Sequence, residues 1–172
     1  MNDTFLPGNG FDTCEEQDRV LMGLSGSVRS GVAVRILQQQ GFAVAAAVVR
    51  LADTPEEHAA AEAAKALAKK LDVECIALNA EALAEQDADA ARFAALLTAA
   101  DKLGIQYVAS GHYARMETDT QGVSHLFPPE SGAPDESDRL AALSPEVLAR
   151  LILPLGDFAP EDVAEMAEDF KL

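Results

Sequence analysis

The chain has 172 residues, of which 49% are hydrophobic and only 5% aromatic, so it can form one domain whose core is mostly alanine, leucine and valine. Its formal net charge of −16 opposes binding to a phosphate backbone and disfavours broad nucleic-acid binding. Solubility, or a saline or acidic-proteome host, is the commoner cause of such acidity. Two cysteines, Cys14 and Cys75, provide neither a disulfide framework nor a metal quartet. We expect a cytoplasmic protein without a membrane partner, because no apolar run could span a bilayer and no signal-like N-terminus is seen.

Residues 1–18 contain proline and glycine without an apolar period, and we expect them to be a flexible leader. The apolar run at 20–24 then predicts a buried strand, and small residues predict a turn over 25–27. A helix should follow and end at Gly41. Its apolar face is formed by residues spaced four apart: Val28, Val32 and Ile36.

The same alternation continues along the chain. Further strands are predicted at 42–49, 73–78 and 105–110, and one helix or two at 81–103. The helix between the second and third strands should start at Thr54, with Pro55 at its first position and Glu57 completing a capping box. This order predicts an α/β fold, a doubly wound parallel sheet of four or five strands with helices on both faces.

The chain is less regular from Met116 onward. A hairpin tip is predicted at 119–122, a connection at 128–138, and short helices starting near 144 and 159. We therefore divide the chain into the leader 1–18, an α/β domain over 19–115 and a C-terminal extension over 116–172.

The turn at 25–30 is the first candidate site. A strand that enters a helix through small residues points backbone N–H groups and the positive helix end at one place, where an anion is stabilised. In parallel sheets such ligands bind beyond the carboxyl ends of the strands, which is also where 111–115 should lie. The turn lacks the Walker sequence and the three-glycine dinucleotide sequence, so an ordinary tight connection is the alternative.

Several segments, in the same order, resemble one family, the bacterial tRNA-specific 2-thiouridylases with their N-terminal PP-loop ATPase domain. The most specific are Ser110-Gly111-His112-Tyr113-Ala114-Arg115 and Pro154-Leu155-Gly156-Asp157, and the others lie at 20–26, 39–42, 66–73, 103–109, 143–150 and 163–168. The resemblance implies the adenine nucleotide alpha hydrolase-like, or HUP, fold over 19–115. It also implies a reaction in which ATP adenylates the wobble uridine of tRNA before a cysteine persulfide delivers sulfur.

The family motif Ser-Gly-Gly-x-Asp-Ser implies that ATP, with Mg²⁺, is the candidate cofactor. The resemblance assigns to nucleotide binding the residues Ser25, Gly26, Ser27, Arg29, Ser30, Gly111 and His112. For His112, an equal alternative is a strand-end histidine bonded to backbone.

The departures from the motif predict that catalysis is degenerate. Ser27 replaces a glycine and Arg29 replaces the aspartate, so ATP binding should be weak or absent. The segment 79–103 lacks the expected cysteine, the second cysteine and the later tRNA-binding and barrel domains would lie beyond residue 172, and Lys-Asp-Gln-Ser has become Pro134-Asp135-Glu136-Ser137. We assign no catalytic residue and no metal ligand.

Three interpretations remain open. The chain is a thiouridylase-like protein without catalysis, or a module that binds ATP or AMP and acts as a regulator or scaffold through a protein partner. In the third, an active thiouridylase receives its missing parts from a separate chain. The isolated chain should not bind tRNA.

Overall fold

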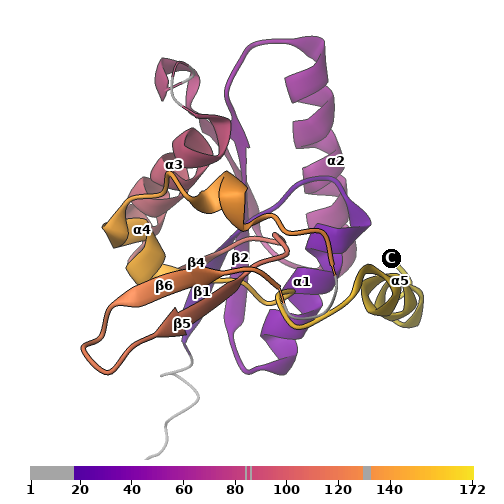
Figure 1. Cartoon of the computed structure of the whole chain (residues 1–172). Coiled ribbons are helices and arrows are strands. Elements are labelled where there is room, and N and C mark those ends of the chain that lie inside the picture. The colour runs from indigo at the N-terminus through magenta and orange to yellow at the C-terminus, as the bar shows by residue number, and fades with distance from the viewer. Residues whose placement is uncertain (1–17, 84, 86, 130–132) are drawn as a thin grey trace, which may run out of the picture.

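The computed structural model describes residues 18–83, 85, 87–129 and 133–172. The predicted leader, apart from Asp18, and Cys14 lie outside these residues. The centre of the molecule is a sheet with the strand order β3-β2-β1-β4-β7, in which every pairing is parallel (Figure 1). Its strands are β1 (Arg19–Gly23), β2 (Ala43–Arg50), β3 (Cys75–Asn79), β4 (Tyr107–Ala109) and β7 (Leu151–Ile152). The predicted doubly wound parallel sheet is confirmed.

The main helices begin at side-chain caps. Helix α1 (Val28–Gln39) follows Ser27, α2 (Pro55–Leu71) follows Thr54, and α3 (Ala88–Leu103) follows Asp87. In each case the cap side chain accepts a hydrogen bond from the backbone N–H three residues on, which satisfies a donor that the helix itself leaves unpaired. The predicted segment 81–103 is therefore broken, with a short 3-10 helix η2 (Glu81–Leu83) before the cap of α3.

The helices cover both faces of the sheet. Helices α1, α2 and α5 (Pro160–Asp169) share one core with the side chains of Val20 and Met22. Helices α3 and α4 (Pro145–Arg150), together with the 3-10 helix η3 (Ser137–Leu140), share a second core with Leu21 and Val108. Figure 1 shows these two groups on opposite sides of the strands. The alternation of core residues along β1 explains why this strand is buried on both faces.

The C-terminal extension contains more regular structure than short helices alone. Its first part is the antiparallel hairpin of β5 (Arg115–Thr118) and β6 (Ser124–Phe127), with Gly122 at φ +82° in the predicted tip. Its strand β7 pairs with β4 and completes the sheet. The predicted short helices are α4 and α5, and the latter shares a core with α1.

Arg150 explains why β4 begins two residues later than the predicted strand 105–110. Its Nη2 donates to the carbonyl oxygen of Ile105 at 2.8 Å and its Nε to that of Gln106 at 2.7 Å. Its Nη1 lies 2.6 Å from Asp101 Oδ1. The arginine thus occupies backbone acceptors before β4 and fixes α4 against the end of α3.

No helix in the described part of the chain is long and apolar enough to cross a membrane.

Candidate nucleotide site

A cavity of about 260 Å³ lies where the sheet reverses its strand order, between the carboxyl ends of β1 and β4. This is the position at which open α/β sheets bind ligands. One part of the cavity is apolar, and its wall comes from β2, α2 and α3 through Ala47, Val48, Val49, Ala60, Phe93 and Leu96. The other part is polar, and it is lined by the serine turn, by charged residues of α2 and α3, and by residues from β4 onward.

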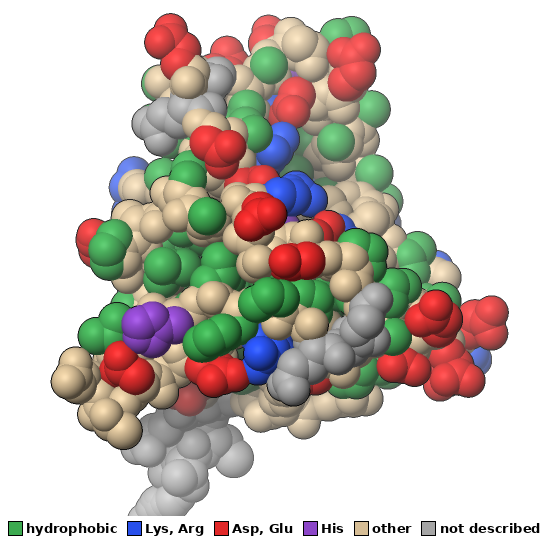
Figure 2. Space-filling view, viewed as in Figure 1, with side chains coloured by type: hydrophobic (Ala, Val, Ile, Leu, Met, Phe, Trp, Pro, Cys, Tyr) green, Lys and Arg blue, Asp and Glu red, His purple; other side chains and the backbone are tan. Residues whose placement is uncertain are grey.

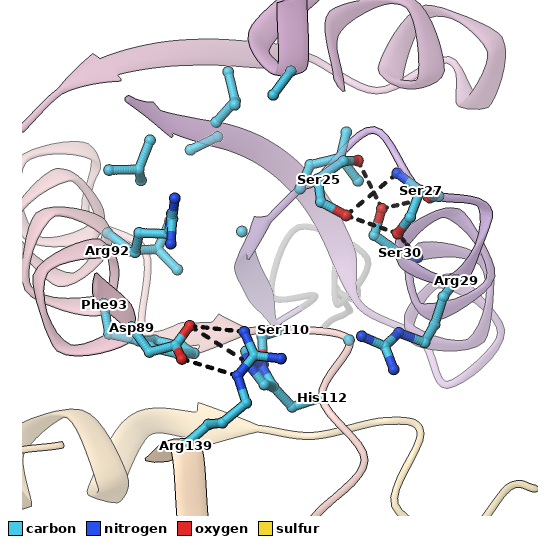
Figure 3. Close-up of a pocket in the computed structure, with 18 of the residues that line it drawn as sticks. Ser25, Ser27, Arg29, Ser30, Asp89, Arg92, Phe93, Ser110, His112 and Arg139 are labelled. Carbon is cyan, nitrogen blue, oxygen red and sulfur yellow. Dashed lines mark hydrogen bonds and ion pairs between the residues drawn. The ribbon is translucent and has the colours of Figure 1, made fainter. Parts of the chain in front are cut away.

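The serine turn after β1 is held together by its own hydrogen bonds (Figure 3). Ser27 Oγ accepts from the backbone N–H of Ser30 at 3.4 Å and lies 2.8 Å from Ser25 Oγ. Ser30 is buried, and its hydroxyl lies 2.8 Å from the carbonyl oxygens of both Ser25 and Ser27. These hydroxyls already have partners within the turn, so an anion bound there would compete with them.

Gly26 is part of this turn but does not line the cavity. A Cβ atom on Gly26 would lie 2.5 Å from the Cβ of Ala63 in α2, a distance that real side chains do not reach. The absence of a side chain therefore allows the turn to pack directly on α2.

Gly111 brings the second half of the site against the first. A Cβ on this residue would lie 3.6 Å from the Cα of Ser30. Both Gly111 and His112 line the cavity, next to the end of β4.

Arg29 points toward Glu136, on the segment that leads into η3. Its Nη1 lies 3.3 Å from Oε1 and 3.4 Å from Oε2 of that carboxylate, and its guanidinium lies 4.7 Å above the ring of Tyr113. Glu136 Oε1 also accepts a hydrogen bond from the backbone N–H of Tyr113 at 2.8 Å. The arginine that replaces the motif aspartate is thus paired within the protein.

A second polar cluster surrounds His112. Its Nδ1 lies 2.7 Å from Ser110 Oγ, and its Nε2 lies 3.7 Å from Asp89 Oδ1. Arg139 lies against the same carboxylate, with Nε 3.1 Å from Oδ2, and it also reaches Glu136 at 3.4 Å. Burial lowers the pKa of His112 below its usual 6.5, against the opposing effect of Asp89. The lowered pKa favours the neutral imidazole at pH 7, and the side chain bonds to Ser110 rather than to backbone.

Glu57 lies at the rim of the same cavity. Instead of closing the expected capping box on Thr54, its carboxylate accepts from the backbone N–H of Leu51 at 3.0 Å and lies 3.4 Å from Arg92 Nη2. Glu57 does not cap α2 because its side chain faces α3, where it pairs with Arg92.

Six of the seven sequence-predicted residues line the cavity, namely Ser25, Ser27, Arg29, Ser30, Gly111 and His112. The structure adds charged residues that the sequence reasoning did not assign to a site: Glu57, Asp89, Arg92, Glu136 and Arg139. Only Glu136 carried a signal, because it stands in the altered Lys-Asp-Gln-Ser stretch. The others are helical residues whose pairing depends on how the elements pack.

Cys75 is the described cysteine, and it does not line the cavity. It begins β3, which β2 separates from β1. Burial raises the pKa of its thiol, so the thiolate is disfavoured at neutral pH.

Comparison with known proteins agrees with this architecture. The family profile described as "tRNA methyl transferase HUP domain" matches residues 18–88 and 88–172. The tRNA-specific 2-thiouridylase MnmA of Yersinia pestis (strain Pestoides F) is 33% identical over 184 aligned positions, which cover 91% of this chain and 49% of that protein. The chain therefore spans about half the length of the curated relatives it matches.

Two solved structures share the fold. The U34-tRNA thiolase NcsA from Methanococcus maripaludis, described with its [4Fe-4S] cluster, has a TM-score of 0.62 and 16% identity, covering 95% of this chain and 59% of that one. A predicted subunit of tRNA methyltransferase from Methanocaldococcus jannaschii has a TM-score of 0.52 and 14% identity, covering 88% of this chain and 74% of that one.

The parallel sheet and its flanking helices define an α/β domain with the HUP fold, the fold type of the PP-loop ATPases. The chain belongs to the tRNA methyl transferase HUP domain family, and the resemblance to the tRNA-specific 2-thiouridylases is confirmed.

Proposed function

We propose that this chain is a thiouridylase-like PP-loop domain that binds an adenine nucleotide and does not thiolate tRNA on its own. Nucleotide binding is supported by the cavity between β1 and β4, where an apolar wall faces a polar one. A planar base fits the apolar wall formed by β2, α2 and α3. A phosphate group would lie toward the serine turn and Arg29.

The proposal that the chain does not thiolate tRNA on its own rests on the residues of the site. Arg29 replaces the motif aspartate, so a cation stands where a carboxylate could help to hold Mg²⁺, and the residues present do not fit that ion. Among the described residues that line the cavity there is no cysteine, so no thiolate is available to carry or deliver sulfur.

Regulation or scaffolding through a protein partner is a second candidate function. The altered motif and the retained cavity favour it, because a domain that binds a nucleotide without consuming it can report on that nucleotide. A cytoplasmic location stays a prediction.

A thermal unfolding series tests the nucleotide-binding proposal. A ligand that binds only the folded state raises its stability, so adenosine, AMP or ATP at millimolar concentration should raise Tm. Ala60→Trp should abolish this shift, because Ala60 is an exposed residue of α2 that lines the cavity and a large ring there would fill it.

Ala59→Trp is the matched control, because Ala59 is the exposed neighbour and does not line the cavity. No Tm shift in the unaltered protein with any of the three ligands would contradict the proposal. An equal shift in the Ala60→Trp variant would place the ligand elsewhere.

A further inference from the structure

The charged side chains around the cavity cancel one another, and we propose that the site therefore prefers a nucleoside monophosphate to a magnesium-bound triphosphate, with Glu136 as the residue that sets this preference. The inference rests on the proposed nucleotide binding and specifies its ligand.

Three arginines and three carboxylates form the charged surroundings of the cavity. Arg92 pairs with Glu57 at 3.4 Å, Arg139 with Asp89 at 3.1 Å, and Arg29 with Glu136 at 3.3 Å. The space-filling view shows basic and acidic side chains next to one another in the middle of the molecule (Figure 2). Three positive and three negative charges leave no net positive charge for a polyphosphate.

Glu136 holds both arginines on the η3 side of the cavity. Its carboxylate is 15% exposed, and it contacts Arg29 and Arg139 as well as the backbone N–H of Tyr113. Arg29 and Arg139 line the cavity, whereas Glu136 lies behind them. A chain of phosphates that extends along these arginines would compete for them with the carboxylates of Glu136 and Asp89, and like charges brought together in a desolvated site are costly.

One phosphate group is easier to accommodate. Both contacts of Arg29 with Glu136 run through the single atom Nη1, and a guanidinium has five N–H donors. The remaining donors of Arg29 can face one phosphate while the pair with Glu136 stays formed.

The serine turn and the cavity size point the same way. The hydroxyls of Ser27 and Ser30 are engaged within the turn, so it offers a phosphate chain fewer free donors. The cavity of about 260 Å³ lies just below the usual range for ligand sites, about 300–1,000 Å³. That size suits a nucleoside with little beyond it.

Calorimetric titration of AMP, ATP and ATP with Mg²⁺ into the unaltered protein is the direct test. We expect AMP to bind about tenfold more tightly than ATP with Mg²⁺, because the β- and γ-phosphates would meet arginines that are already paired with carboxylates. If ATP with Mg²⁺ binds more tightly than AMP, this inference is overturned and the proposed nucleotide binding stands. If neither binds, the proposed function itself fails.

The variant Glu136→Gln tests the residue. Its amide oxygen can still accept from Tyr113, so the fold should persist, and the preference for AMP should shrink by about tenfold because one negative charge is removed. Glu168→Gln removes the same charge from α5, away from the cavity lining, and should leave the preference unchanged. An unchanged preference in Glu136→Gln, or an equal change in both variants, would overturn the role of Glu136.

Discussion

Arg29 and Glu136 lie 107 residues apart in the sequence and form one ion pair beside the cavity. Each departs from the resembled motif, since one replaces an aspartate and the other stands in the altered Lys-Asp-Gln-Ser stretch. Considered separately, each change indicates that the nucleotide-binding motif has degenerated. The structure shows that they compensate each other, because the new cation is neutralised by the new carboxylate and both stay bonded.

This pair also marks the limit of prediction at the scale of residues. The sequence predicted a turn over 25–27 before a helix, and the structure confirms it with Ser27 as the cap of α1, because small residues before an apolar helical period have a local signature. The partner of Arg29 has no local signature. It is set by how the segment before η3 crosses the end of β4, which depends on tertiary packing.

His112 should make the stability of the protein sensitive to mild acid. Its pKa is lowered in the folded protein by burial, so between that value and about 6.5 the unfolded chain binds more protons than the folded one. The free energy of unfolding should therefore fall as pH drops below 6.5 and level off once the folded histidine is protonated. Urea unfolding of the unaltered protein and of His112→Gln between pH 7.5 and pH 5 measures this, and the variant should lose part of the slope.

Substitution of His112 also identifies its imidazole signal in an NMR titration of the whole protein. The midpoint of that signal should lie below 6.5. A midpoint above 6.5, or the same pH slope in both proteins, would contradict the expected effect.

At the scale of elements, the regular βα alternation was predictable and the short pieces were not. Strands β1, β2 and β3 and helix α2 lie close to the predicted ranges, because apolar runs and capping residues define them locally. Strand β7 has two residues, which is too short for any period. It forms because it directly follows α4, which places it beside the free edge of β4.

We expect Arg150 to hold α4, and with it β7, in position beside β4. It bonds to Asp101 and to the carbonyl oxygens of Ile105 and Gln106, and charge-assisted bonds of this kind stabilise by about 1.5–3 kcal/mol. Arg150→Met keeps much of the side-chain length and removes these bonds. The free energy of unfolding, measured in urea, should fall by about that amount.

Lys102→Met is a suitable control, since it removes one positive charge from the exposed last turn of α3 nearby. It should change the free energy of unfolding by less than about 0.5 kcal/mol. Equal losses in the two variants would show that charge, rather than the bonds to backbone, is responsible.

For the molecule as a whole, the net negative charge and the lack of a cysteine among the described residues that line the cavity both predict that the chain alone does not thiolate tRNA. The net charge of −16 repels tRNA, and Figure 2 shows acidic side chains gathered around α5 at the right of the view. We expect no 2-thiouridine when the chain is incubated alone with tRNA, ATP, Mg²⁺ and a sulfide donor. Mass spectrometry of nucleosides from digested tRNA measures this, and a full-length thiouridylase serves as the positive control. Thiolated tRNA above background would show that the chemistry is intact.

The strand order has a consequence for how the chain folds. Strand β1 pairs on one side with β2, which is close in sequence. On its other side it pairs with β4, where Val20 lies opposite Tyr107, so this second pairing forms only after β4 has been synthesised. At the pace of protein synthesis, about 5–20 residues per second, that delay lasts on the order of ten seconds. During this interval one edge of an apolar strand stays open, which is the condition under which chains associate wrongly or engage a chaperone. The same late pairing brings Ser110, Gly111 and His112 to the cavity, so a nascent chain cannot form the candidate site before its fourth strand docks.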